Sequence, residues 1–79
     1  MLKILFFGPV VERVGCASMA MAFQAGMSLQ DIVTQLQSRY PSAFEIVCFI
    51  ALNQVQTRDM TTCLNDQDEI AFMAKFSGG

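Results

Sequence analysis

One segment in the middle of the sequence has the spacing of an amphipathic α-helix, and it limits the folds open to the rest of the chain. Its apolar residues recur at helical intervals and share one face: Leu29, Ile32, Val33, Leu36 and Tyr40. Ser28 stands before them as a candidate N-cap, and Asp31 follows three residues later, as in a capping box. Pro41 disfavours helical geometry in the residue before it, so the helix is predicted to end near Tyr40.

Short apolar runs typical of β-strands lie on both sides of this helix. We expect strands over residues 2–7, 17–25, 45–53, 54–57 and 69–76. The alanine- and methionine-rich second run has weak strand propensity and is also compatible with a helix, but its length and flanking glycines favour a strand. Asn53-Gln54 is suited to a tight turn between two of the strands.

This order of elements predicts an α+β fold. One helix is expected to lie across one face of a mixed sheet of four to five strands, in a roll whose first and last strands are long enough to be central. A chain of 79 residues allows one domain. We therefore expect a domain over residues 1–76 and a flexible C-terminal tail over residues 77–79.

The predicted sheet has large apolar side chains on both faces, although one helix covers only one of them. Leu5 and Phe7 in the first strand, and Met73 in the last, alternate with the residues expected to face the helix. Either loops cover this second face or a partner protein binds it. We favour a partner.

The sequence holds little catalytic equipment of its own. Histidine is absent, which excludes Ser-His-Asp and Cys-His catalysis and most transition-metal sites. The cysteines Cys16, Cys48 and Cys63 include no closely spaced pair, so neither a disulfide framework nor a Cys-x-x-Cys site is expected. Cys48 lies inside the apolar run "IVCFIAL" and is predicted to be a small core residue.

Charge and hydropathy exclude further classes of function. Seven acidic and five basic residues give a net charge of −2, and no basic stripe supports nucleic-acid binding. Asp66, Asp68 and Glu69 are interpreted as a solvated acidic turn rather than a metal site. No apolar run approaches the roughly 18 residues of a membrane span, and no signal-peptide pattern is present, so we expect a cytoplasmic protein that binds no cofactor itself.

The sequence ends in Ser77-Gly78-Gly79, directly after the last predicted strand. Glycine lacks a Cβ atom and can approach another backbone closely. Three extended residues reach about 10 Å, so this tail could thread a narrow channel and present the Gly79 carboxylate inside a partner. A carboxylate is a poor electrophile until it is activated, and the chain has no nucleotide-binding motif, so an ATP-using activator would be a separate protein.

Taken together, a small roll that ends in Gly-Gly resembles the ubiquitin-like sulfur carriers of the β-grasp fold, and more narrowly the small subunits of molybdopterin synthase. The similarity covers essentially the whole chain. It lies in the opening "KILFFGPVVERVG", the hairpin "IALNQ", the acidic turn and last strand "LNDQDEIAF", and the tail "SGG".

The resemblance implies a carrier role for the C-terminus. An adenylating enzyme would use ATP to activate the Gly79 carboxylate, and a sulfurtransferase step would convert it to a thiocarboxylate. With Ser77 and Gly78 threaded into the large synthase subunit, the carrier would give its sulfur to cyclic pyranopterin monophosphate in molybdopterin biosynthesis. The large subunit would hold the catalytic Lys and Arg groups, so that this chain alone is not catalytic.

The same resemblance implies which residues dock on the large subunit. These partner-binding residues would be Leu5, Phe7, Met73, Lys75 and Phe76. Three departures from the family pattern bear on partner choice. Gln67 replaces the usual glycine of the acidic turn, Val11 stands where an arginine is frequent, and the stretch before the tail lacks two usual prolines.

Three other functions remain open at this point. The first is a sulfur carrier for thiamine, cysteine or tRNA thiolation, which would use the same C-terminal chemistry with another acceptor. The second is a ubiquitin-like modifier whose Gly79 forms isopeptide bonds with lysines. The third is a β-grasp interaction module with an inert tail.

Overall fold

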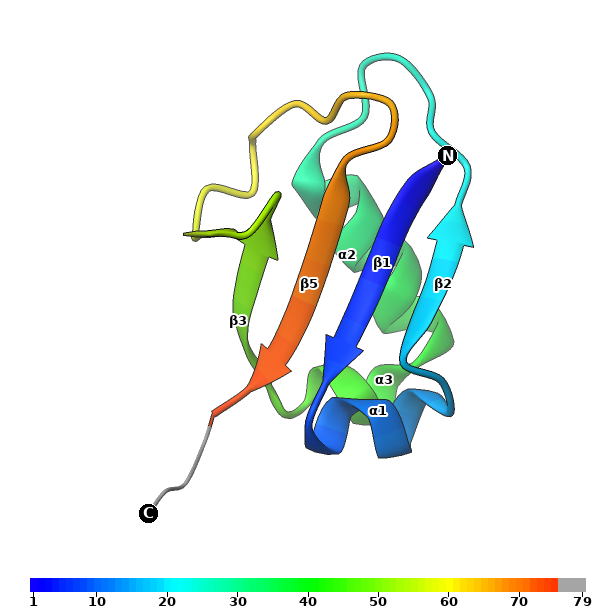
Figure 1. Cartoon of the computed structure of the whole chain (residues 1–79), viewed down its shortest axis with the longest axis vertical. Coiled ribbons are helices and arrows are strands. Elements are labelled where there is room, and N and C mark those ends of the chain that lie inside the picture. Colours follow the sequence, from blue (N-terminus) through cyan, green and yellow to red (C-terminus); the bar gives the residue numbers. More distant parts are fainter. Residues whose placement is uncertain (76–79) are drawn as a thin grey trace.

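The computed structural model describes residues 1–75 and shows a five-stranded mixed sheet with its longest helix across one face (Figure 1). In chain order the elements are β1 (Leu2–Phe7), α1 (Pro9–Val14), β2 (Ser18–Met21), α2 (Leu29–Arg39), α3 (Pro41–Phe44), β3 (Val47–Leu52), β4 (Val55–Thr57) and β5 (Glu69–Ala74). The strand order is β2-β1-β5-β3-β4, in which β1 and β5 are parallel and the other pairs antiparallel. The predicted α+β roll, with β1 and β5 inside the sheet, is confirmed.

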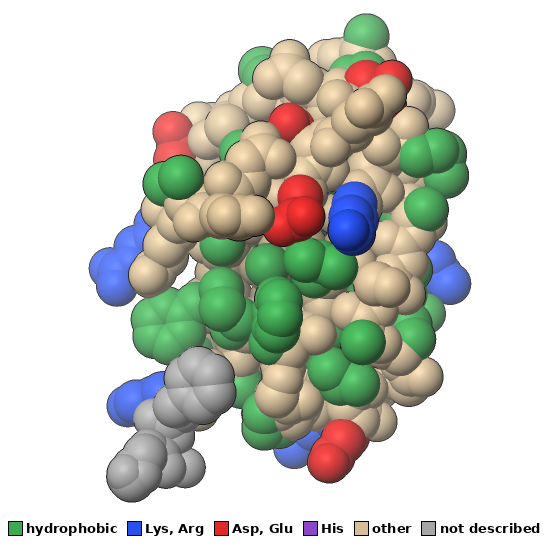
Figure 2. Space-filling view, in the orientation of Figure 1, with side chains coloured by type: hydrophobic (Ala, Val, Ile, Leu, Met, Phe, Trp, Pro, Cys, Tyr) green, Lys and Arg blue, Asp and Glu red, His purple; other side chains and the backbone are tan. Residues whose placement is uncertain are grey.

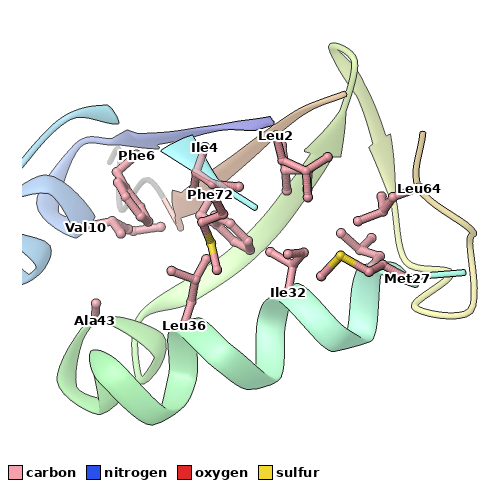
Figure 3. Close-up of a cluster of buried hydrophobic side chains, with 14 residues drawn as sticks. Leu2, Ile4, Phe6, Val10, Met27, Ile32, Leu36, Ala43, Leu64 and Phe72 are labelled. Atoms are coloured by element: carbon pink, nitrogen blue, oxygen red, sulfur yellow. The ribbon is translucent and has the colours of Figure 1, made fainter. Parts of the chain in front are cut away.

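The core lies between α2 and the sheet. Leu29, Ile32 and Leu36 are fully buried on the inner face of α2, as their spacing predicts. Figure 3 shows Ile32 and Leu36 pointing toward side chains that alternate along β1 and β5. On the sheet side, buried apolar residues are Leu2, Ile4, Phe6, Ile70, Phe72 and Ala74.

The start of α2 is held by the predicted capping box. The Asp31 backbone N–H donates to Ser28 Oγ at 3.3 Å, and the Ser28 N–H donates to Asp31 Oδ2 at 2.9 Å. These bonds satisfy two backbone donors that would otherwise lack partners at a helix N-terminus. The helix ends at Arg39, two residues before Pro41.

Two short helices were not expected from the sequence. Pro9 occupies the first turn of α1, and Gly15 closes it with a left-handed φ of 97°. Pro41 similarly opens α3. Pro41 was predicted only to end the preceding helix, but a proline also suits the first turn of a helix because the N–H it lacks has no intrahelical partner there.

The second strand is shorter than predicted. It spans Ser18–Met21 instead of residues 17–25, and its last residue, Met21, pairs with Leu2 at the start of β1. Since β1 is its one neighbour in the sheet, the strand ends where that neighbour begins. Beyond this point the alanine-rich sequence has no pairing partner that would offset its weak strand propensity.

The prediction that Cys48 is a core residue is wrong. The pairing of β3 with β5 shifts between Val47 and Phe49, which inserts Cys48 as an extra residue and leaves it exposed. The shift also turns Val47 toward the core with Ile50 and Leu52, while Phe49 lies on the opposite face.

The predicted tight turn at Asn53-Gln54 is confirmed. Asn53 and Gln54 adopt positive φ values of 50° and 70° between β3 and β4, as a two-residue hairpin turn requires. Among residues 1–75, the longest helix has 11 residues, and none combines the length and apolar character that crossing a bilayer would need.

Candidate functional site

The sheet face that α2 does not cover carries an apolar patch, which we call the open-face patch. It consists of Leu5, Phe7, Phe49, Ala51, Ala71 and Met73. The strand registers bring these residues together, because Leu5 and Ala51 both pair with Ala71, and Phe7 and Phe49 both pair with Met73. Figure 2 looks onto this face and shows hydrophobic side chains gathered over its middle.

The patch contains a shallow open pocket of about 300 Å³. Its apolar lining comes from the patch, and its rim is polar, formed by Gln54, Gln56 and Glu69. Phe7 is 45% exposed, unusually high for a large apolar side chain inside a sheet. An apolar centre with a polar rim is the anatomy of a protein-binding surface.

Charged groups lie beside the patch but not within it. Lys3 and Glu69 are register partners on β1 and β5, and both point to the open face. Figure 2 shows one basic and one acidic side chain next to the hydrophobic area. A docked partner would therefore meet apolar groups first and a pair of opposite charges at one end.

The open-face patch adjoins the place where the chain leaves the sheet. The strands β1 and β5 run parallel, and the pair Phe7 and Met73 lies at their C-terminal ends. Residue 75 follows the end of β5 directly, so a partner on the patch would also be near the start of the C-terminal segment.

The predicted site residues divide into three groups. Leu5, Phe7 and Met73 lie together on the open face. Lys75 is exposed but lines a different hollow, of about 380 Å³, together with Arg13 and Cys48. The remaining ones, Phe76, Ser77, Gly78 and Gly79, lie outside the described residues, as does the predicted boundary between domain and tail.

Sequence reasoning did not include three members of the patch among the site residues. Ala71 follows from simple alternation with Phe72, which was available from the sequence. Alternation also places Phe49 and Ala51 on one face of β3, but the pattern of residues alone does not show that β3 pairs with β5 and so brings them into the patch.

The acidic turn before β5 has a structural role. Asp68 is buried, and its carboxylate accepts hydrogen bonds from the Asn65 N–H at 2.8 Å and from Asn53 Nδ2 at 3.0 Å. The interpretation of this turn as solvated is therefore wrong for Asp68. Within residues 1–75, no group of three or more His, Cys, Asp or Glu side chains is placed to hold a metal ion.

Two exposed carboxylates have shifted titration. The Met1 ammonium group donates to Asp66 Oδ1 at 2.6 Å, and this bond lowers the pKa of Asp66. A hydrogen bond from the Thr61 side chain lowers the pKa of Asp59, aided by one from the Thr61 backbone N–H. Neither carboxylate belongs to the open-face patch, so these shifts reflect local structure and not a reactive group.

Comparison with solved structures shows relatives of the same fold. SAMP1 from Haloferax volcanii is 16% identical with a TM-score of 0.83, over 99% of this chain and 98% of that one. Urm1 from Trypanosoma brucei is 17% identical with a TM-score of 0.77, over 99% and 94%. A chain from the complex of subunits 1 and 2 of the molybdopterin-converting factor of Helicobacter pylori is 28% identical with a TM-score of 0.74, over 99% and 97%.

The family comparison covers nearly the whole sequence. None of the curated proteins matches the chain. The model of the ThiS family matches residues 4–79, which include the whole sheet except the first two residues of β1. The chain therefore belongs to the ThiS family of ubiquitin-like sulfur carriers.

Proposed function

We propose that this protein carries sulfur for molybdopterin synthesis, as the small subunit of a two-subunit transferase in the cytoplasm. The observation that supports this acceptor is the 28% identity, over nearly the full length of both chains, to a protein solved as a complex of subunits 1 and 2 of the molybdopterin-converting factor. The open-face patch supports a protein partner on this chain as well, because it leaves Phe7 exposed and Phe49 and Met73 half-buried beside the end of β5.

The proposed chemistry takes place at Gly79. Its carboxylate oxygen attacks the α-phosphorus of ATP in an adenylating enzyme and releases pyrophosphate. Hydrosulfide released by a sulfurtransferase then attacks the acyl carbon, AMP leaves, and a thiocarboxylate remains. Transfer of that sulfur to cyclic pyranopterin monophosphate, followed by hydrolysis, returns the carboxylate for another round.

In this proposal the large subunit supplies the catalytic groups and the small subunit supplies the reactive carboxyl end. Leu5, Phe7 and Met73 dock on the large subunit, and Lys75 and Phe76 lead into the tail. Ser77 and Gly78 pass through a channel too narrow for larger side chains. This division suits a chain that has no histidine and whose described residues include no metal-binding cluster.

The experiment that tests carrier chemistry is intact-mass spectrometry of the full chain after reaction with an adenylating enzyme, ATP and a sulfur source. We expect a species heavier by the difference between one sulfur and one oxygen atom, located at Gly79 by fragmentation. A chain that lacks Gly79 is the matched control and should show no shift. The proposal would be refuted if the full-length chain stays unmodified in a reaction whose adenylating enzyme is shown to be active on another carrier.

A second candidate function is protein modification. The similarity to SAMP1, a type of protein described as a small archaeal modifier, and to Urm1 favours it at the level of fold. Conjugation would join Gly79 to lysines of other proteins and produce a ladder of larger species in lysate with ATP.

A carrier for another thiolation pathway would give the thiocarboxylate but no sulfur transfer to cyclic pyranopterin monophosphate with the large subunit.

A further inference from the structure

The strand β2 forms one edge of the sheet and pairs with β1 alone. The Phe6 N–H donates to the Ala17 carbonyl at 2.9 Å. This bond fixes which residues of β2 direct their backbone N–H and C=O groups toward β1, because such residues alternate along an antiparallel pair. Met19 and Met21 therefore use their backbone groups toward β1. Ser18 and Ala20 direct their N–H and C=O groups away from the sheet.

Within the described part of the chain, nothing covers this outer edge. Figure 1 shows β2 at the right-hand border of the sheet, with no further strand beside it. Ser18 and Ala20 are exposed, and their outward backbone groups have no hydrogen-bond partner among residues 1–75. Four backbone groups thus face solvent in a row, which is the arrangement that a further strand would pair with.

The edge also lacks two of the features that usually prevent strand pairing, charged side chains and prolines. Residues 14–30 contain no Asp, Glu, Lys or Arg and no proline. Natural edge strands are commonly protected by charged side chains, prolines or bulges. The opposite edge fits that description better, because β4 has only three residues and is followed directly by Arg58 and Asp59.

We propose that β2 pairs antiparallel with β2 of a second copy of this chain about a two-fold axis at Met19. Ser18 then lies opposite Ala20 of the other copy, and the two such pairs exchange four backbone hydrogen bonds. Ser18 and Ala20 both point to the open face. The open face of one sheet therefore continues into the open face of the other, and the core-facing face does the same.

A second copy fits this edge better than a charged strand of another protein. Two-fold pairing places Ser18 opposite Ala20 of the other copy, so charges of one sign at these two positions would repel each other. An uncharged strand avoids this repulsion, and the small side chains of Ser18 and Ala20 present no steric obstacle to close pairing. A strand rich in Lys or Asp would find no opposite charge on β2.

The pairing is compatible with docking at the open-face patch but does not depend on it. The strand β1 separates β2 from β5, so the end of β5 stays accessible in both copies. The contact surface is one short strand, and we expect weak, concentration-dependent association instead of a permanent dimer.

Sedimentation equilibrium of the full chain tests this proposal. We expect the weight-average mass to rise from 8.7 kDa toward twice that value as the concentration increases to about 1 mM. The double variant Ser18→Lys, Ala20→Lys places lysines directly opposite each other in both pairs, and the association constant should fall by about tenfold or more. The charge-matched control Gln35→Lys, Gln37→Lys on the exposed face of α2 should associate like the wild type.

A second variant separates pairing from folding. Ala20→Pro removes one outward N–H and leaves the β1 ladder intact, so it should fold by circular dichroism and associate less. In the wild type, the amides of Ser18 and Ala20 should exchange more slowly at high concentration. A constant mass of 8.7 kDa up to about 1 mM would overturn the proposal and leave the edge to a strand of another protein. Unchanged association of the lysine double variant would overturn it as well.

Discussion

Replacing Gln67 with glycine should stabilise the protein, although the substitution removes a whole side chain. Gln67 has a φ of 70° in the turn that leads into β5. This left-handed conformation costs an L-residue roughly 1–2 kcal/mol, whereas glycine adopts it freely. The Gln67 N–H donates to the Met1 carbonyl at 3.1 Å, and glycine keeps that donor.

The expected gain is modest because glycine also gives the unfolded chain more freedom. That effect costs roughly 0.5–1 kcal/mol and leaves a net stabilisation of roughly 0.75 kcal/mol. For a domain of this size, such a gain raises the melting temperature by roughly 3–6 °C. The exposed Gln67 side chain makes no hydrogen bond within residues 1–75, so little else is lost.

Thermal and urea unfolding of three chains would measure the effect. The control Gln37→Gly makes the same chemical change on the exposed face of α2, where glycine should cost about 1 kcal/mol. We expect the two glycine variants to move the free energy of unfolding in opposite directions. If Gln67→Gly is neutral or destabilising while Gln37→Gly loses stability as stated, the turn is not strained and the reasoning fails.

Three further predictions concern docking, packing and titration. Met73→Glu places a charge in the open-face patch, so it should weaken binding to a large synthase subunit at least tenfold in calorimetry; an equal loss of folding stability would show instead that Met73 serves the core. Phe72→Ala should lower the free energy of unfolding in urea by about 3–5 kcal/mol, because this buried ring packs against two other aromatic rings, and a loss below about 1 kcal/mol would contradict that packing. The pKa of Asp59 is below its ordinary value of 3.8, so the Thr61 bonds contribute stability above that pH and lose it as the pH falls through the lowered pKa. Thr61→Val should raise this pKa toward 3.8 in an NMR titration of the carboxyl carbon, and an unchanged value would exclude the hydroxyl as the cause.

Much of the fold follows from local patterns in the sequence. The capping residues and apolar spacing of α2, and the alternation along β1 and β5, depend on neighbours within a few positions, and all of them are confirmed. The exposure of Cys48 could not be predicted in this way. It depends on how β3 pairs with a strand that follows about twenty residues later, which no local pattern encodes.

The candidate site shows the same division. Leu5, Phe7 and Met73 were expected on one face because alternation within each strand places them there, and the structure brings them together. Lys75 was grouped with them by alternation along the last strand, yet β5 ends at Ala74 and the Lys75 side chain lines another hollow. Phe49 shares a face with Ala51 by simple alternation, and the pairing of β3 with β5 brings it beside Met73.

The parallel pairing of β1 with β5 also affects how the protein is made. The strand at the middle of the sheet is translated after every other described element, so Leu2, Ile4 and Phe6 stay without their neighbours on β5 until residues 69–74 have emerged from the ribosome. Contacts between such distant parts of a chain form slowly. A nascent chain that stalls before β5 would expose most of its apolar interior, which makes it a natural target for chaperones and proteases.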